Sequence, residues 1–137
     1  MNYLTLLISL ILFSLSAQAQ TPDSLQTSNQ RITEALLEKA VQYLGLQPEQ
    51  QHGFQEAVHT HLEQARLYMA QHSADTVLVT DYLEQQWPAL LGEALRPVLS
   101  AEQMRSLSER IHIQRGRRDI DQRRGYRHQP QEYLFFF

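Results

Sequence analysis

Cysteine is missing from the 137 residues of this sequence, so the fold contains no disulfide bond. The five glycines are scattered along the chain, which leaves no glycine-rich loop to hold a phosphate group. The sequence also contains no nucleophile elbow, P-loop, dinucleotide fingerprint, zinc-protease helix motif or EF-hand loop. We therefore expect a binding protein rather than an enzyme, with no required cofactor.

Lysine is scarce, since Lys39 is the only one beside eleven arginines. Residues 1–104 hold 4 basic and 11 acidic residues, whereas residues 105–137 hold 8 basic and 4 acidic ones. Arginine favours planar, bidentate contacts with carboxylates or phosphates. The basic end is expected either to pair with the acidic body of the chain or to contact lipid headgroups, lipopolysaccharide phosphates or an acidic protein surface. The candidate contact residues are Arg115, Arg117, Arg118, Arg123 and Arg124.

The N-terminus has one apolar run, from residue 4 to residue 15, followed by the small-x-small sequence Ala17-Gln18-Ala19. This pattern is typical of a secretory signal peptide that is cleaved before Gln20. A membrane anchor is the alternative, but a run of twelve residues is shorter than the roughly 20 that span a bilayer. We expect residues 1–19 to be removed and the rest to be exported without a transmembrane segment. Because residue 20 is not cysteine, a lipoprotein anchor is not expected.

Apolar residues at helical spacing predict about four long amphipathic helices. Gly45 favours the positive φ that ends a first helix, Asp75 or Ser73 is a suitable cap for a third, and Trp87-Pro88 predicts a kink or a restart. The predicted spans are 30–44, 48 to a break at 73–75, from that break through the kink to about 98, and 101 to about 116 or beyond. The expected fold is all-α, a small bundle or hairpin in one domain over residues 31–116, after a disordered lead-in at 20–30.

The last part of the sequence, residues 117–137, is basic and ends in aromatic residues. Ile120 is the only apolar residue of the charged stretch 117–124, and Tyr133-Leu134-Phe135-Phe136-Phe137 follows Pro130. We expect a flexible tail whose aromatic end either packs on the chain itself or adds as a strand to the PDZ groove of a periplasmic protease. Aromatic residues at 133, 135 and 137 imitate the last strand of an outer-membrane barrel, but the alternating segments of a barrel do not precede them.

Six histidines raise the question of a metal site. His52 and His59 share one face of the second predicted helix, and Glu56 lies between them, four residues after His52. These side chains are suitable ligands for zinc, copper, nickel or cobalt, and His112 on another helix is a candidate third partner. The alternative is that all of them are surface or boundary residues.

Two helix starts in the sequence read alike: Leu46-Gln47-Pro48-Glu49-Gln50 and Leu99-Ser100-Ala101-Glu102-Gln103. In the second, Ser100 and Gln103 form the pattern of a capping box, with each side chain accepting a hydrogen bond from the other residue's backbone N–H. In the first, Gln47 is a poor cap, although Pro48 suits the first helical position. The residues of this paired motif are Leu46, Gln47, Gln50, Leu99, Ser100 and Gln103.

With its leader, its helical periodicity and these paired starts, the chain resembles the periplasmic Spy/CpxP family, known for two Leu-Thr-x-x-Gln motifs. The resemblance covers about residues 36–116, with Gln47 and Ser100 at the two threonine positions. It implies a small helical homodimer in the periplasm that chaperones unfolded envelope proteins without ATP or modulates a membrane stress sensor. In relatives, the family also responds to zinc, nickel or cobalt.

We therefore expect a periplasmic envelope-stress protein whose partners are unfolded envelope proteins or a membrane sensor. Nucleic acid is not an expected partner, because an exported protein rarely meets it. The alternative function is a periplasmic metal-binding sensor or scavenger that uses His52, Glu56, His59 and His112.

Overall fold

The computed structural model describes residues 21–137, and these residues form helices and connecting loops without a strand. The predicted leader and its cleavage residues, Ala17, Ala19 and Gln20, lie outside the described part of the chain. The elements are α2 (Thr21–Leu44), α3 (Pro48–Gln71), α4 (Thr76–Asp81), the π-helix η1 (Tyr82–Gln86), α5 (Trp87–Leu95), α6 (Ala101–Arg123) and the 3-10 helix η2 (Pro130–Leu134). The predicted all-α fold class is confirmed.

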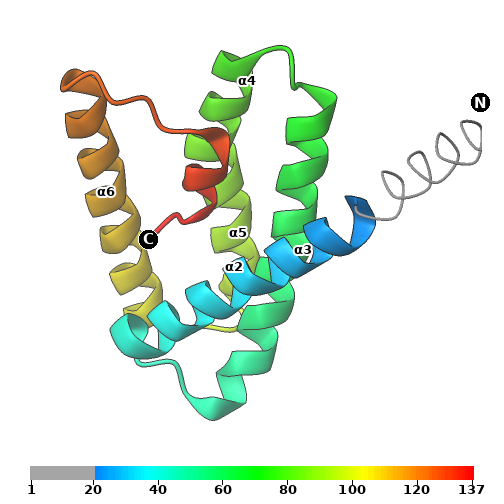
Figure 1. Cartoon of the computed structure of the whole chain (residues 1–137). Helices are drawn as coiled ribbons and strands as arrows, with labels where there is room; N and C mark the ends of the chain where they lie inside the picture. The colour runs from blue at the N-terminus through cyan, green and yellow to red at the C-terminus, as the bar shows by residue number, and fades with distance from the viewer. Residues whose placement is uncertain (1–20) are drawn as a thin grey trace, which may run out of the picture.

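Three helical columns stand side by side: α3, the continuous α4–η1–α5 column, and α6 (Figure 1). Helix α2 crosses them at one end and contacts both α3 and α6. The C-terminal segment returns between α6 and α5, where it fills the centre of the molecule. One hydrophobic core therefore lies between α2, α3, α5 and the C-terminal segment.

Helix α2 begins at Thr21, well before the predicted start near residue 30. Its buried Asn29 and its neighbour Ser28 accept hydrogen bonds from the guanidinium group of Arg66 on α3, at 2.8 Å for the Ser28 Oγ. Thr33 Oγ1 donates to the main-chain oxygen of Asn29 at 2.8 Å. The expectation of a disordered lead-in is therefore wrong for residues 28–30, because polar partners on α3 fix them in place.

The predicted kink at Trp87-Pro88 is confirmed, and it takes the form of a π-helical turn. Residues Tyr82–Gln86 adopt this turn directly before Pro88, which has no N–H to continue an α-helical hydrogen-bond ladder. Trp87 is fully buried, and its Nε1 donates to the main-chain oxygen of His61 at 2.8 Å. The kink thus turns the bulkiest side chain of the protein towards α3.

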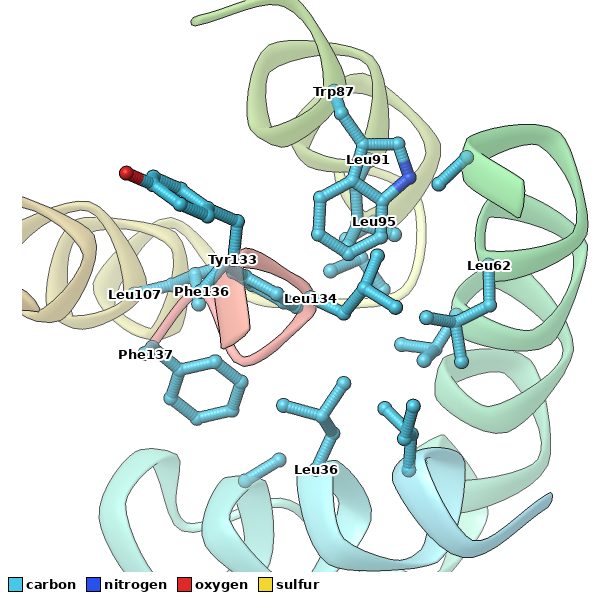
Figure 2. Packing of buried hydrophobic residues seen from close by; sticks show 14 of the residues in the cluster. Leu36, Leu62, Trp87, Leu91, Leu95, Leu107, Tyr133, Leu134, Phe136 and Phe137 are labelled. Atoms are coloured by element: carbon cyan, nitrogen blue, oxygen red, sulfur yellow. The ribbon is translucent and has the colours of Figure 1, made fainter. Parts of the chain in front are cut away.

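The expected flexible tail is wrong, and the alternative that the aromatic end packs on the chain itself is what the structure has. Helix α6 continues beyond Gly116 to Arg123, and Tyr133, Leu134, Phe136 and Phe137 are all buried (Figure 2). Lys39 on α2 donates to the main-chain oxygen of Phe137 at 3.0 Å. The physical reason is that α6 has a narrow apolar face, on which Leu107 is the buried hydrophobic residue. The aromatic segment supplies the missing apolar layer between α6 and α5.

Burial raises the pKa of the Tyr133 phenol above its ordinary value of 10.0, with a further contribution from the nearby charge of Glu84. Such a group stabilises the fold below its unfolded-state pKa, and this stabilisation is lost as pH rises from about 10 through the folded-state pKa. We expect urea unfolding to show a steeper loss of stability between pH 9 and pH 11 in the wild type than in Tyr133→Phe. Equal pH slopes would contradict burial of this hydroxyl.

Candidate functional site

The two predicted helix starts are observed, and they differ as the sequence indicates. At α6, Ser100 Oγ accepts the N–H of Gln103 at 3.1 Å, and Gln103 Oε1 accepts the N–H of Ser100 at 2.9 Å. At α3, Gln50 Oε1 accepts the N–H of Gln47 at 2.9 Å, but the Gln47 side chain turns away and donates to the main-chain oxygen of Gly45. The capping box is complete in the second start and half-formed in the first.

The two motif glutamines also bind each other, although they are 53 residues apart. Gln50 Nε2 donates to Gln103 Oε1 at 2.7 Å, and Gln103 Nε2 donates to Gln50 Oε1 at 3.0 Å. Gln50 Nε2 also donates to the main-chain oxygen of Val98 at 3.0 Å, and Gln103 Nε2 donates to that of Gly45 at 3.3 Å. Each of these carbonyls lies two residues before the cap of the other motif. We call Gln50 and Gln103 the glutamine clamp. It ties the N-termini of α3 and α6 together, with Leu46 and Leu99 buried beside it.

The five candidate arginines do not form one basic surface. Arg118 is 3% exposed, and its guanidinium carbon lies 4.8 Å from the centre of the Tyr133 ring, a cation–π contact. Burial lowers the pKa of Arg118, and the nearby Glu84 carboxylate opposes this effect. Arg123 pairs with Asp119 at 2.9 Å within α6. Arg118 is therefore not available to an anionic partner, whereas Arg117, Arg123 and Arg124 are exposed. For these three, contact with an anionic partner stays a prediction.

Arg115 supports the kinked column. Pro88 cannot donate to the main-chain oxygen of Glu84, four residues earlier, and Arg115 Nη2 donates to that oxygen at 2.5 Å. A part-buried carbonyl that loses its donor costs about 1–3 kcal/mol. We expect Arg115→Met to lower the free energy of unfolding by that amount in urea titrations. The exposed neighbour Arg117→Met is the control and should change it by less than about 0.5 kcal/mol. Equal losses of stability in Arg115→Met and Arg117→Met would show that Arg115 does not stabilise the kinked column.

A surface groove of about 400 Å³ lies between the end of α2 and the middle of α6. Tyr43 and Ile113 are exposed apolar residues of its walls, at 43% and 53%. The guanidinium of Arg110 lies 3.7 Å from the centre of the Tyr43 ring. Arg117 lines the groove as well, and Phe137 of the C-terminal segment forms part of its wall. Glu109 also lines the groove, which we call the α2/α6 groove, so apolar, aromatic, cationic and acidic side chains meet there.

The candidate metal ligands on α3 lie along a second groove, of about 450 Å³, between α2 and α3. His52, Glu56 and His59 line it together with Glu34 of α2. The closest approach within the predicted set is 3.8 Å between His52 Nε2 and Glu56 Oε2, whereas His59 Nε2 lies 3.3 Å from Glu63. No three histidine or acidic side chains of residues 21–137 are grouped closely enough to hold an ion. His112 lies on α6 and does not line this groove.

The glutamine clamp and the α2/α6 groove were missed in the sequence for different reasons. Prediction of the clamp requires knowing that the two helix starts meet. Prediction of the groove requires knowing that the C-terminal segment returns to α2 and α6. Over the described range, no helix has the length and apolar character to cross a membrane. Comparisons with protein-family models, with curated proteins and with solved structures find no match to this chain.

Proposed function

We propose that this protein is exported to the periplasm, where it binds unfolded or misfolded envelope proteins as an ATP-independent chaperone or as a modulator of stress signalling. The observation that carries the proposal is the α2/α6 groove, which places Tyr43 and Ile113 in solvent beside Arg110 and Arg117. Unfolded chains expose apolar side chains, carboxylates and peptide carbonyls together. A surface with apolar, aromatic and guanidinium groups offers a contact for each of them.

The stacked pair of Arg110 and Tyr43 suits such a role. An aromatic ring held by a guanidinium presents apolar area with little conformational entropy left to lose, and the guanidinium keeps donors free for a carbonyl or carboxylate. Neither contact depends on the sequence of the bound chain. This combination favours binding of many unfolded segments over recognition of one folded partner.

Aggregation of an unrelated, chemically denatured protein, followed by light scattering, tests the proposal. The protein from Gln20 to Phe137 should suppress scattering at a few-fold molar excess, and Tyr43→Ser/Ile113→Ser should lose most of that effect. Leu67→Ser is the matched control, since Leu67 is 60% exposed on α3 and does not line the groove. Absence of suppression by the wild type, or equal loss in the control, would refute the proposal.

A second candidate function is binding of a transition-metal ion in the groove between α2 and α3. The observation in its favour is that Glu34, His52, Glu56 and His59 line one groove. Calorimetric titration with zinc, nickel and copper should then show a site that His52→Ala/His59→Ala abolishes. His112→Ala serves as the control and should retain it. Absence of binding, or binding unaffected by the double variant, would exclude this site.

We further infer that the working form is a homodimer and that its partners are unfolded envelope proteins or a membrane sensor, without nucleic acid. The sequence resemblance supports this inference. Measurement of the molar mass in solution, with and without added zinc, should give twice the chain mass. A monomer under both conditions would refute it.

A further inference from the structure

The C-terminal segment, residues 130–137, occupies the protein in the way that a bound peptide occupies a receptor. It contacts α4, η1, α5, α6 and α2, and we call the surface that these elements form around it the trough. Phe136 packs edge-on against Trp87, with ring centres 5.5 Å apart, and Leu134 is fully buried. Phe137 lines the α2/α6 groove as well, so the trough and the groove are continuous.

Side chains, rather than the main chain, hold this segment in place. In the described structure, the main-chain hydrogen bonds of residues 130–137 are local, from Glu132 to Gln129 and from Phe135 to Glu132, apart from the bond that Lys39 donates to Phe137. Gln122 Nε2 donates to the Tyr133 hydroxyl at 3.1 Å. The trough therefore selects apolar and aromatic side chains along a short peptide and makes few demands on its main chain.

The connection to α6 is suited to release of the segment. Residues 124–127 and Gln129 are exposed, and Gly125 has a φ of +90°, which favours glycine. His128 lies between Asp121 of α6 and Glu132 of the segment, at 3.1 and 3.3 Å, and these contacts hold the first residues of the segment to α6. Leu107 is the buried hydrophobic residue of α6, so α6 has little apolar surface of its own to pack against α5. Removal of the segment would therefore leave the trough open on the side of α6.

We propose that the trough is the binding surface for clients and that the C-terminal segment is its built-in occupant, which an aromatic-rich segment of an unfolded polypeptide replaces. This inference rests on the proposed function and adds the chemical class of the bound segment. The exchange conserves contacts, because apolar side chains replace apolar side chains. What opposes it is the tethering of the resident segment, whose effective concentration is on the order of millimolar. The apparent affinity for a client is reduced by the fraction of molecules with an open trough.

The test uses a fluorescent peptide with the sequence of residues 129–137 and the protein from Gln20 to Phe137, with binding measured by anisotropy. Phe136→Ala in the protein weakens its own segment and should bind the peptide about tenfold more tightly than the wild type. Lys39→Met removes a hydrogen bond that the peptide would also accept, so its affinity should not exceed that of the wild type. Arg96→Met also removes one positive charge, but its partner Glu93 lies on the surface of α5, so its affinity should equal that of the wild type. A peptide with serine at the positions of Leu134 and Phe136 should not bind.

If Phe136→Ala does not fold, it will not bind the peptide more tightly than the wild type. Melting curves distinguish an unfolded variant from a folded variant whose trough is open. The unaltered peptide should raise the melting temperature of Phe136→Ala more than that of the wild type, because it binds the folded form. Phe135→Ala changes a segment residue that is only partly buried and provides the same comparison with a smaller loss of core packing. Emission of Trp87, the single tryptophan, should return towards the wild-type spectrum when the peptide brings a ring back against it.

Equal affinity of the peptide for Phe136→Ala and for the wild type, or no saturable binding, would overturn the inference. So would a dimer of Phe136→Ala that the peptide does not dissociate, since the trough would then take the segment of a second copy. Aggregation suppression that is unchanged in the weakened variants would also overturn it while leaving the proposed chaperone function intact. Peptide binding without any suppression of aggregation would support the trough as a peptide site and refute the proposed chaperone function.

Discussion

Phe136→Ala is expected to lower the free energy of unfolding by about 3–5 kcal/mol, the cost of deleting a large aromatic side chain from a close-packed core. Phe136 is 1% exposed and contacts Trp87, and its ring centre lies 4.9 Å from that of Phe137. Its removal would leave a cavity between α5 and α6, which meet largely through this segment. Urea denaturation followed by circular dichroism measures the loss.

Phe135→Ala is the matched control, one residue away in the same segment. Its side chain is only partly buried, and its stabilising contact with Lys39 is a 5.7 Å cation–π interaction, so we expect a loss of about 1 kcal/mol. A residue in a flexible tail would give a negligible effect in both variants. That outcome would contradict the packing of the C-terminal segment.

Gln50→Ala and Gln103→Ala are each expected to lower the free energy of unfolding by about 2–3 kcal/mol, because each removes a helix-start contact and leaves the other amide without its partner. The single side chain of Gln103 forms hydrogen bonds with Ser100, Gly45 and Gln50. Since the two amides bond to each other, their losses should not add. The double variant should show a coupling energy of about 1–2 kcal/mol.

Gln47→Ala is the control for this cycle. The Gln47 side chain donates one exposed hydrogen bond to Gly45 and does not cap α3, so we expect a change below about 0.5 kcal/mol. Chemical unfolding of the four proteins of the cycle, together with this control, gives the coupling. Strict additivity of the two glutamine variants would mean that the clamp does not join the helices.

Local features of the fold were predictable because they depend on neighbours within a few residues. Gly45 ends α2 with a φ of +66°, Asp75 Oδ1 accepts the N–H of Leu78 at 3.0 Å to cap α4, and Ser100 caps α6. Pro88 predicts a kink in any helix that contains it, because it has no N–H to donate. In each case the backbone chemistry of one residue decides the outcome.

Contacts between distant segments could not be predicted in the same way. Arg118 belongs to the charged stretch 117–124, which the sequence pattern predicts to be solvated, yet it stacks on Tyr133, and the nearby Arg115 donates to the main chain of Glu84. The aromatic end has no helical or alternating pattern that shows what it packs against. Its burial follows from the narrow apolar face of α6, which only becomes apparent when α6 is placed beside α5.

The sequence by itself determined the all-α class, the main helix boundaries, the kink and the two helix starts, because hydrophobic spacing and capping act locally. Tertiary structure decided what those starts do together, since Gln50 and Gln103 meet only after α3 and α6 have packed. It also decided that residues 130–137 form the centre of the molecule rather than a free tail. An apolar segment leaves water wherever a complementary surface exists, and that surface is built from helices far away in the chain.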